Sequence, residues 1–397
     1  MEMTSVTYVV NARFPTERAH GLQVARMCEA FQRLHVRTAL IHPARHQPPW
    51  LAGRDPLEFY AVRRAFAVHT LPNLDIFRVE RWSPRTLFTM AHFAHGRLWA
   101  QYAARRASRL APADLFVARD IPVAASLVRR GVPTALELHG APKRWSLDIL
   151  KSITARPSLR VIVTLTDALR QTLADRGVEM KNAIVLHDAV DLDRFGNGAS
   201  PPPERPRPLV LYTGHLFHEK GIDTLVDAAR LAPGISVKCV GGTSDDIARW
   251  RRRVSEEGPD NVEFTGYVPA DQIPSLQQAA DLLVLPNSGL SDHSSRYTSP
   301  MKLFEYMAAG RPIVATSVPA IREILSHGVN SWLVPPDDPA ALADAFRTLV
   351  DDRVLRHRLA TRARSDVAAR SWDRRAMSLA IAAGYFVRPV RGQQDPC

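Results

Sequence analysis

The sequence predicts an α/β protein with two Rossmann-like parallel-sheet domains that face each other across a cleft. Short apolar runs alternate with amphipathic stretches along most of the 397 residues, an order typical of parallel sheets with crossover helices. The alternation stops once, at residues 197–208, where five prolines with Gly and Ser indicate an extended linker. A cleft between two such domains is a common place for ligands.

The elements follow in order on both sides of the linker. In the domain at residues 1–196, strands are expected at 6–10, 38–41, 115–118, 135–138, 161–165 and 184–186, with helices at 21–34 and 167–176. In the domain at residues 209–372, strands are expected at 209–212, 236–240, 262–264, 282–285 and 313–315, with helices at 222–231, 245–257 and 301–309. A C-terminal helix in residues 373–397 is expected to return to the first domain.

Composition excludes several classes of protein. The chain is 46% hydrophobic and 23% charged, and no apolar run approaches the ~18 residues of a membrane span. The start of the sequence lacks the basic and apolar regions of a signal peptide, so a cytoplasmic location is expected. Its three cysteines, at 28, 239 and 397, have no metal-ligand spacing and predict free thiols.

The charge of +12 suits a phosphorylated substrate, an anionic membrane or a nucleic acid. The basic residues are dispersed and no nucleic-acid motif is found, so no nucleic-acid partner is expected. Residues 43–112 interleave aromatic residues with Arg and His. Two interpretations stay open here: surface helices whose aromatics pack on the core, or an acceptor or peripheral membrane-contact element.

Residues 297–315 carry the sharpest pattern. Ser299 suits an N-cap and Pro300 the first helical position, before a run of helix formers that ends at Gly310. The N-terminus of such a helix attracts phosphate, and Lys302 adds a full charge there. Glu305 shares the face of Lys302, where its carboxylate can accept hydrogen bonds from ribose hydroxyls. Phosphate and diol together describe a nucleotide, although an ordinary capped helix with an ion pair has the same pattern.

This segment resembles the donor-binding motif of family 4 retaining glycosyltransferases, two-domain enzymes of the GT-B fold. The family pattern is a Glu, seven residues, a second Glu, and then a Met-Ala-x-Gly-x-Pro run. Glu305 matches the second Glu, which in the family holds the donor ribose. Tyr297 stands where the first Glu is expected, and the chain is more similar to a sub-group with Thr-Ser-Pro-x-Lys. The resemblance makes residues 209–372 the nucleotide-sugar donor domain and residues 1–196 the acceptor-side domain.

Other segments match the family in order. The loop with Gly214, His215 and Lys220 resembles the phosphate-binding turn after the first donor-domain strand, and the backbone at Tyr267 and Val268 resembles the base contact. In the first domain, His139 matches a histidine near the transferred sugar. The resemblance therefore implies His139, Lys220 and Lys302 as catalytic residues. It implies as donor-binding residues Gly21, Gly214, His215, Tyr267, Val268, Tyr297, Ser299, Pro300, Met301 and Glu305.

The implied reaction is transfer of a hexose or N-acetylhexosamine, with retention, from a UDP- or GDP-linked donor. A donor phosphate oxygen takes the acceptor proton in this family, so no cofactor and no metal is expected. The acceptor, whether lipid-linked or a small-molecule glycoside, is not fixed by the sequence. A sugar-nucleotide epimerase or phosphorylase on a similar fold, and a non-enzymatic basic membrane- or nucleic-acid-binding module, are the alternatives.

Overall fold

The computed structural model describes residues 1–75, 85–196 and 202–387. The chain divides into two units: the first holds Met1–His187 and the chain from Trp372 onward, and the second holds Asp188–Ser371. The boundary predicted at residue 196 therefore lies too late. Residues 188–195 belong to the second unit because Val190 bridges to Ser371 and Phe195 is buried in the second unit's core. Part of the predicted linker, residues 197–201, lies outside the described residues.

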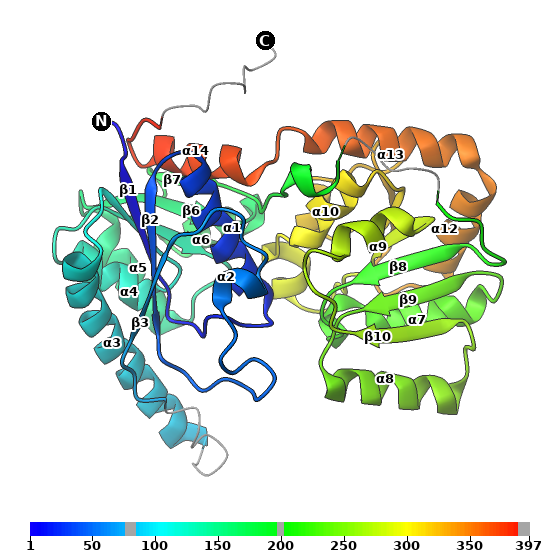
Figure 1. Ribbon diagram of the computed structural model, residues 1–397, viewed down its shortest axis with the longest axis horizontal. Helices are drawn as coiled ribbons and strands as arrows, with labels where there is room; N and C mark the ends of the chain where they lie inside the picture. Colours follow the sequence, from blue (N-terminus) through cyan, green and yellow to red (C-terminus); the bar gives the residue numbers. More distant parts are fainter. Residues whose placement is uncertain (76–84, 197–201, 388–397) are drawn as a thin grey trace. The chain divides into compact units, whose positions relative to one another are not determined.

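The first unit is built on a parallel sheet, drawn in Figure 1. In its described part seven strands run in the order β3-β2-β1-β4-β5-β6-β7. Their bounds are β1 Ser5–Val9, β2 Arg37–Pro43, β3 Ala67–Leu71, β4 Leu115–Ala118, β5 Thr134–Leu138, β6 Leu159–Thr164 and β7 Ala183–Val185. The order reverses on either side of β1, the switch point at which doubly wound sheets place their ligands.

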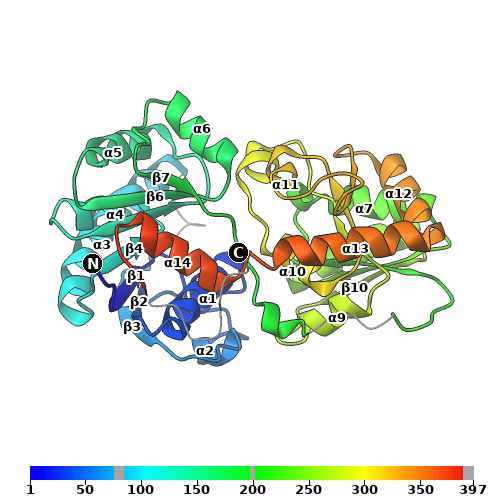
Figure 2. The ribbon, with the colours of Figure 1, turned by 90° about the horizontal axis from the view of Figure 1, so that it is seen from above.

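Helices cover this sheet. Their bounds are α1 Ala19–Arg33, α2 Pro56–Phe59, α3 Arg85–Leu110, α4 Ile121–Val128, α5 Arg144–Thr154, α6 Asp167–Asp175 and α14 Trp372–Ala382. The C-terminal helix α14 packs beside α1, as Figure 2 shows in red and blue. Strand β3 was not predicted, because it is an edge strand whose mixed Ala-Val-His-Thr-Leu sequence is only partly buried.

The second unit repeats the architecture with described strands in the order β10-β9-β8-β11-β12-β13, all parallel. The strands are β8 Leu209–Thr213, β9 Ser236–Val240, β10 Val262–Gly266, β11 Leu282–Leu285, β12 Ile313–Thr316 and β13 Trp332–Val334. The helices are α7 Ile222–Leu231, α8 Ser244–Glu257, α9 Ile273–Ala279, α10 Met301–Ala309, α11 Pro319–Arg322, α12 Pro339–Asp351 and α13 Arg353–Val367. The switch point lies at β8, between β9 and β11.

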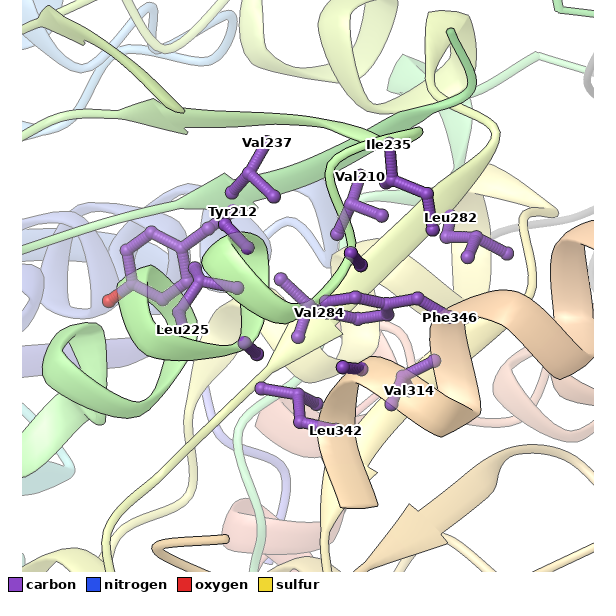
Figure 3. Close-up of a cluster of buried hydrophobic side chains, with 14 of the residues drawn as sticks. Val210, Tyr212, Leu225, Ile235, Val237, Leu282, Val284, Val314, Leu342 and Phe346 are labelled. Carbon is purple, nitrogen blue, oxygen red and sulfur yellow. The ribbon is translucent and has the colours of Figure 1, made fainter. Parts of the chain in front are cut away.

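Alternate residues of β8 and β11 enter two different cores, one on each face of the sheet. Val210 and Val284 lie in a cluster with Phe346 of α12, which Figure 3 shows at the centre of that cluster. Leu211 and Leu283 lie in the opposite cluster with residues of α10 and α13. A strand buried on both faces reads as a continuous apolar run, which is why these strands could be recognised from sequence.

The aromatic segment at residues 43–112 contains α2, β3 and α3, rather than surface helices alone. Tyr60, Phe66 and Trp99 are buried, as the packing interpretation expects, while Trp50 and Tyr102 are exposed. The aromatics Phe77 and Trp82 lie outside the described residues. Within the described ranges, no helix combines the length and apolarity needed to cross a membrane.

Candidate functional site

Helix α10 begins at the carboxyl ends of the second unit's strands, where a site is expected, but its cap differs from the prediction. Pro300 takes the N-cap position and no side chain caps the helix. The predicted N-cap, Ser299, is wrong, because its buried hydroxyl accepts the backbone N–H of Asp188 at 2.8 Å instead. The first-turn N–H groups of Met301 and Lys302 are thus left without a side-chain acceptor, which suits an anionic ligand.

Lys302 turns its side chain toward the end of β8. Its Nζ lies 3.8 Å from the centroid of the Tyr212 ring, a cation–π contact. This Nζ is buried and has no hydrogen-bond partner among the described residues. Burial, and then the charge of Lys220, hold the pKa of Lys302 well below its ordinary value. A desolvated ammonium beside a second cation is costly unless an anion joins them.

Glycines make the space that Lys302 occupies. A Cβ on Gly214 would lie 2.6 Å from Lys302 Nζ, and Gly214 itself has φ of 137°. A Cβ on Gly241, which ends the next strand, would lie 2.3 Å from the Gly214 carbonyl oxygen. The sequence predicted Gly214 from turn geometry. The structure adds the reason that a side chain there would displace the lysine.

Lys220 ends a short 3-10 turn, His218–Lys220, that precedes α7. Burial lowers its pKa. The next residue, Gly221, is left-handed and forms the N-cap of α7. Both lysines are therefore carried by loops or helix starts at the carboxyl edge of the sheet, where the sequence analysis placed them.

Replacing Gly221 with Ala should disrupt this edge. The new Cβ would lie 1.7 Å from the Pro286 carbonyl oxygen at a φ of 72°. Overpacking and the left-handed backbone together should cost about 2–5 kcal/mol of unfolding free energy. Urea titration measures it, with Gly234→Ala as the matched control because nothing lies within 4 Å of a Cβ there. Equal stability of the two variants would contradict the steric account.

Glu305 lies one turn beyond Lys302, partly buried, and its Oε2 accepts a hydrogen bond from Gln277 Nε2 at 3.2 Å. The same amide donates to Thr213 Oγ1 at 3.1 Å, and Tyr306 Oη accepts the Thr213 N–H at 2.8 Å. The carboxylate is thereby fixed to the end of β8. Sequence reasoning missed Gln277, since a lone Gln on α9 carries no motif signal.

The remaining predicted residues of this unit have different surroundings. The His215 ring is stacked on Phe217, with centroids 5.0 Å apart and planes 1° apart, and its carbonyl accepts the Tyr212 hydroxyl at 2.6 Å. Tyr267 is 45% exposed, whereas Val268 packs on the core. Tyr297 is buried. Tyr212 therefore connects the His215 loop to Lys302, because its ring contacts Lys302 Nζ while its hydroxyl donates to the His215 carbonyl.

In the first unit, His139 follows β5 and meets charged partners. Its Nε2 lies 2.6 Å from Glu137 Oε1, and Arg119 Nη2 lies 3.0 Å from its Nδ1. Arg119 Nε also lies 2.9 Å from Nε2. Glu137 can only accept, so the shorter contact assigns the proton to Nε2 and leaves Nδ1 to accept from Arg119. Burial, then Arg119, lower the pKa of His139 to about 4. The imidazole is neutral at pH 7, with both nitrogens engaged.

Gly21 has a packing role that the sequence did not indicate. A Cβ there would lie 2.0 Å from Tyr60 Oη. That hydroxyl accepts the Thr16 N–H at 2.7 Å and donates to the Thr16 carbonyl at 2.8 Å. Tyr60 thus packs against Gly21 in α1 and holds the backbone at Thr16. Within the described residues, no group of three or more His, Cys, Asp or Glu side chains gathers as a metal site.

The two parallel-sheet units define a class of two-domain α/β proteins, and solved structures share this fold. Anabaena HepE in complex with UDP has a TM-score of 0.72 at 16% identity, over 96% of this chain and 99% of that chain. Sucrose-phosphate synthase of Thermosynechococcus elongatus has a TM-score of 0.70 at 17% identity, over 95% and 97%. The fold is GT-B, two Rossmann-like units, as the sequence predicted.

The second unit also matches a family model. Residues 207–352 match Glycosyl transferases group 1. A 2-deoxystreptamine N-acetyl-D-glucosaminyltransferase of Streptomyces fradiae is 30% identical over 67% of this chain and 63% of its own length. An alpha-D-kanosaminyltransferase of Streptomyces kanamyceticus is 31% identical over 40% of each chain. The chain thus spans between 40% and 63% of the length of these curated relatives. None of these matches supports the epimerase or binding-module alternatives.

Proposed function

We propose that this chain transfers a sugar from a nucleotide-sugar donor to an acceptor. The observation that carries the proposal is the buried, unpartnered Nζ of Lys302, beside Lys220 and at the uncapped start of α10. Three sources of positive potential converge there, and among the described residues no carboxylate accepts a hydrogen bond from Lys302 Nζ. A diphosphate supplies that anion.

Glu305 supports a nucleotide rather than a free diphosphate. Its carboxylate lies one helical turn from Lys302 and is held in place by Gln277. A fixed, acceptor-only group at that spacing suits the vicinal hydroxyls of a ribose. The HepE structures of the same fold are complexes with UDP or UDP-glucose, which makes a UDP-linked donor the first choice, with a GDP-linked donor second.

The proposed step breaks the bond from the anomeric carbon to the donor's diphosphate and forms a bond from that carbon to an acceptor oxygen. The acceptor proton passes to the departing diphosphate. Lys220, Lys302 and the start of α10 stabilise the charge that grows on the leaving group. We also propose that the anomeric configuration is retained and that the chain belongs to the sub-group with Thr-Ser-Pro-x-Lys. No metal and no cofactor is assigned to this step.

The transferred sugar is proposed to be a hexose or N-acetylhexosamine, with His139 as the first unit's contribution to its recognition. The relatives named above, whose descriptions mention 2-deoxystreptamine and kanosaminyl transfer, favour a small-molecule glycoside or aminocyclitol acceptor. A lipid-linked acceptor is the second choice. An assay with both acceptor classes, read by mass spectrometry, separates them.

A thermal-shift screen tests the donor assignment. UDP, GDP, ADP and dTDP sugars are each added to the full chain, and the melting temperature is recorded. One class should stabilise the protein, since a ligand at 100 times its Kd adds about 2.7 kcal/mol. Incubating the donor alone then checks for epimerisation. No shift with any nucleotide sugar would contradict the proposed function.

A further inference from the structure

Glu137 is the centre of a buried polar network in the first unit, and it is only 1% exposed. Its Oε1 accepts from Gln23 Nε2 at 2.7 Å and from His139 Nε2 at 2.6 Å. Its Oε2 accepts from Arg375 Nη1 at 3.0 Å. All three partners are donors, so the site requires a group that only accepts.

Arg375 comes from α14, more than two hundred residues away in sequence. It is 4% exposed, and each of its three nitrogens has an acceptor. Nε donates to the His187 carbonyl at 2.8 Å, Nη2 to the Leu186 carbonyl at 3.1 Å, and Nη1 to Glu137. Leu186 and His187 are the last residues before the chain enters the second unit. The guanidinium thus joins α14, the end of the unit and the carboxylate.

We infer that Arg375 is a positioning residue: through Glu137 it fixes the orientation and tautomer of His139. The chain of contacts is continuous, from Arg375 Nη1 to Glu137 Oε2 and from Glu137 Oε1 to His139 Nε2. Any catalytic consequence rests on the proposed function, in which His139 recognises the transferred sugar. The contacts of Arg375, Glu137 and His139 are independent of that function.

The geometry explains why neither partner is easily replaced. Arginine presents a planar fork that can serve two carbonyls and a carboxylate together, whereas one ammonium cannot. A Gln at position 137 would place its amide N–H₂ opposite one of the donors that now bond to the Glu137 carboxylate. Two donors cannot bond to each other, so one hydrogen bond would be lost. Burial alone would raise the pKa of Glu137, but Arg375, His139 and Arg119 hold it well below its usual value.

Four groups face His139 and set its charge. Glu137 lies on β5, Arg119 follows β4, Arg375 lies on α14, and His20 lies on α1. Removing the cation at 375 should raise the pKa of His139 above about 4, because that cation disfavours the imidazolium. Removing the anion at 137 should lower it. The two substitutions therefore shift the same titration in opposite directions.

Nitrogen NMR of the imidazoles tests the inference on the full chain. Spectra of wild type, Arg375→Met, Arg375→Lys and Glu137→Gln are titrated with pH, and the His139 signal is assigned by its loss in His139→Asn. Wild type should show the Nε2–H tautomer of His139. Arg375→Met should raise the pKa of His139, and Glu137→Gln should give a mixture of the two His139 tautomers. Arg375→Lys keeps the charge and should titrate near wild type, which guards against a misfolded Met variant. Arg374→Met, exposed on the same helix, is the control.

Unchanged His139 titration and tautomer in both Arg375→Met and Glu137→Gln would overturn the inference. Binding of UDP is measured alongside and should be unaffected by Arg375→Met, because the groups proposed to hold UDP lie in the second unit. Once an acceptor is known, Arg375→Met should lower kcat by roughly 10- to 100-fold, because His139 would be misplaced, with little change in donor KM. If wild type does not bind UDP or any nucleotide sugar, the proposed function fails, and the spectra still decide the role of Arg375.

Discussion

Replacing Lys302 with Met is expected to weaken binding of UDP by roughly 10- to 100-fold, the equivalent of losing charged hydrogen bonds of about 1.5–3 kcal/mol. The same variant should be more stable than wild type without ligand, by about 1–3 kcal/mol, because a buried unpartnered ammonium is removed. Calorimetric titration with UDP and thermal unfolding measure the two effects. If the substitution weakens UDP binding but raises the free energy of unfolding, Lys302 serves a ligand site and is not a structural lysine.

The control for this variant is Lys238→Met, which removes a partly exposed lysine of β9 that pairs with Glu263 at 3.0 Å. It should leave UDP affinity unchanged. A Lys302→Met protein that binds UDP as tightly as wild type would remove the central observation behind the proposed function.

The charge of Lys302 also predicts a pH dependence. In the free protein its pKa lies well below the ordinary value, whereas a bound diphosphate would raise it. Binding should therefore take up protons, and affinity for UDP should fall as pH rises from neutral toward 10. In the free protein the neutral amine is favoured relative to the unfolded chain, so stability should rise over that range as the amine deprotonates. Both trends should weaken in Lys302→Met, and the part that remains is expected from Lys220, whose pKa burial also lowers.

Replacing Glu305 with Ala is expected to weaken UDP binding by roughly 10- to 100-fold while leaving pyrophosphate binding unchanged. The reason is that the proposed partner of Glu305 is the ribose, which pyrophosphate lacks. Lys302→Met should instead weaken both ligands. Competition calorimetry with the two probes gives both numbers for each variant.

Glu256→Ala, on the exposed face of α8, is the matched control and should bind both probes as wild type does. If Glu305→Ala lost the same affinity for UDP and for pyrophosphate, Glu305 would be assigned to the phosphates and not to the ribose. No loss for either would remove it from the site.

The sequence by itself determined the two α/β units, the central strands and the positions of the two lysines and the glutamate on which the proposed site is built. The strands are buried on both faces, so their apolar runs are continuous, and β4, β9 and β11 have the predicted bounds. Lys220, Lys302 and Glu305 could be found because each follows a glycine turn or a helix start, and those features are local in sequence.

Tertiary structure decided the rest. Ser299 has an N-cap sequence, but its hydroxyl accepts the backbone N–H of Asp188, 111 residues away. Gly21 accommodates Tyr60, and Gly214 accommodates Lys302. Arg375 reaches Glu137 across 238 residues. Burial and partners distant along the chain set these roles, and local propensity contains no information about them. The lysine at the start of α10 was visible in the sequence. Only the fold shows that its Nζ is buried and has no hydrogen-bond partner among the described residues.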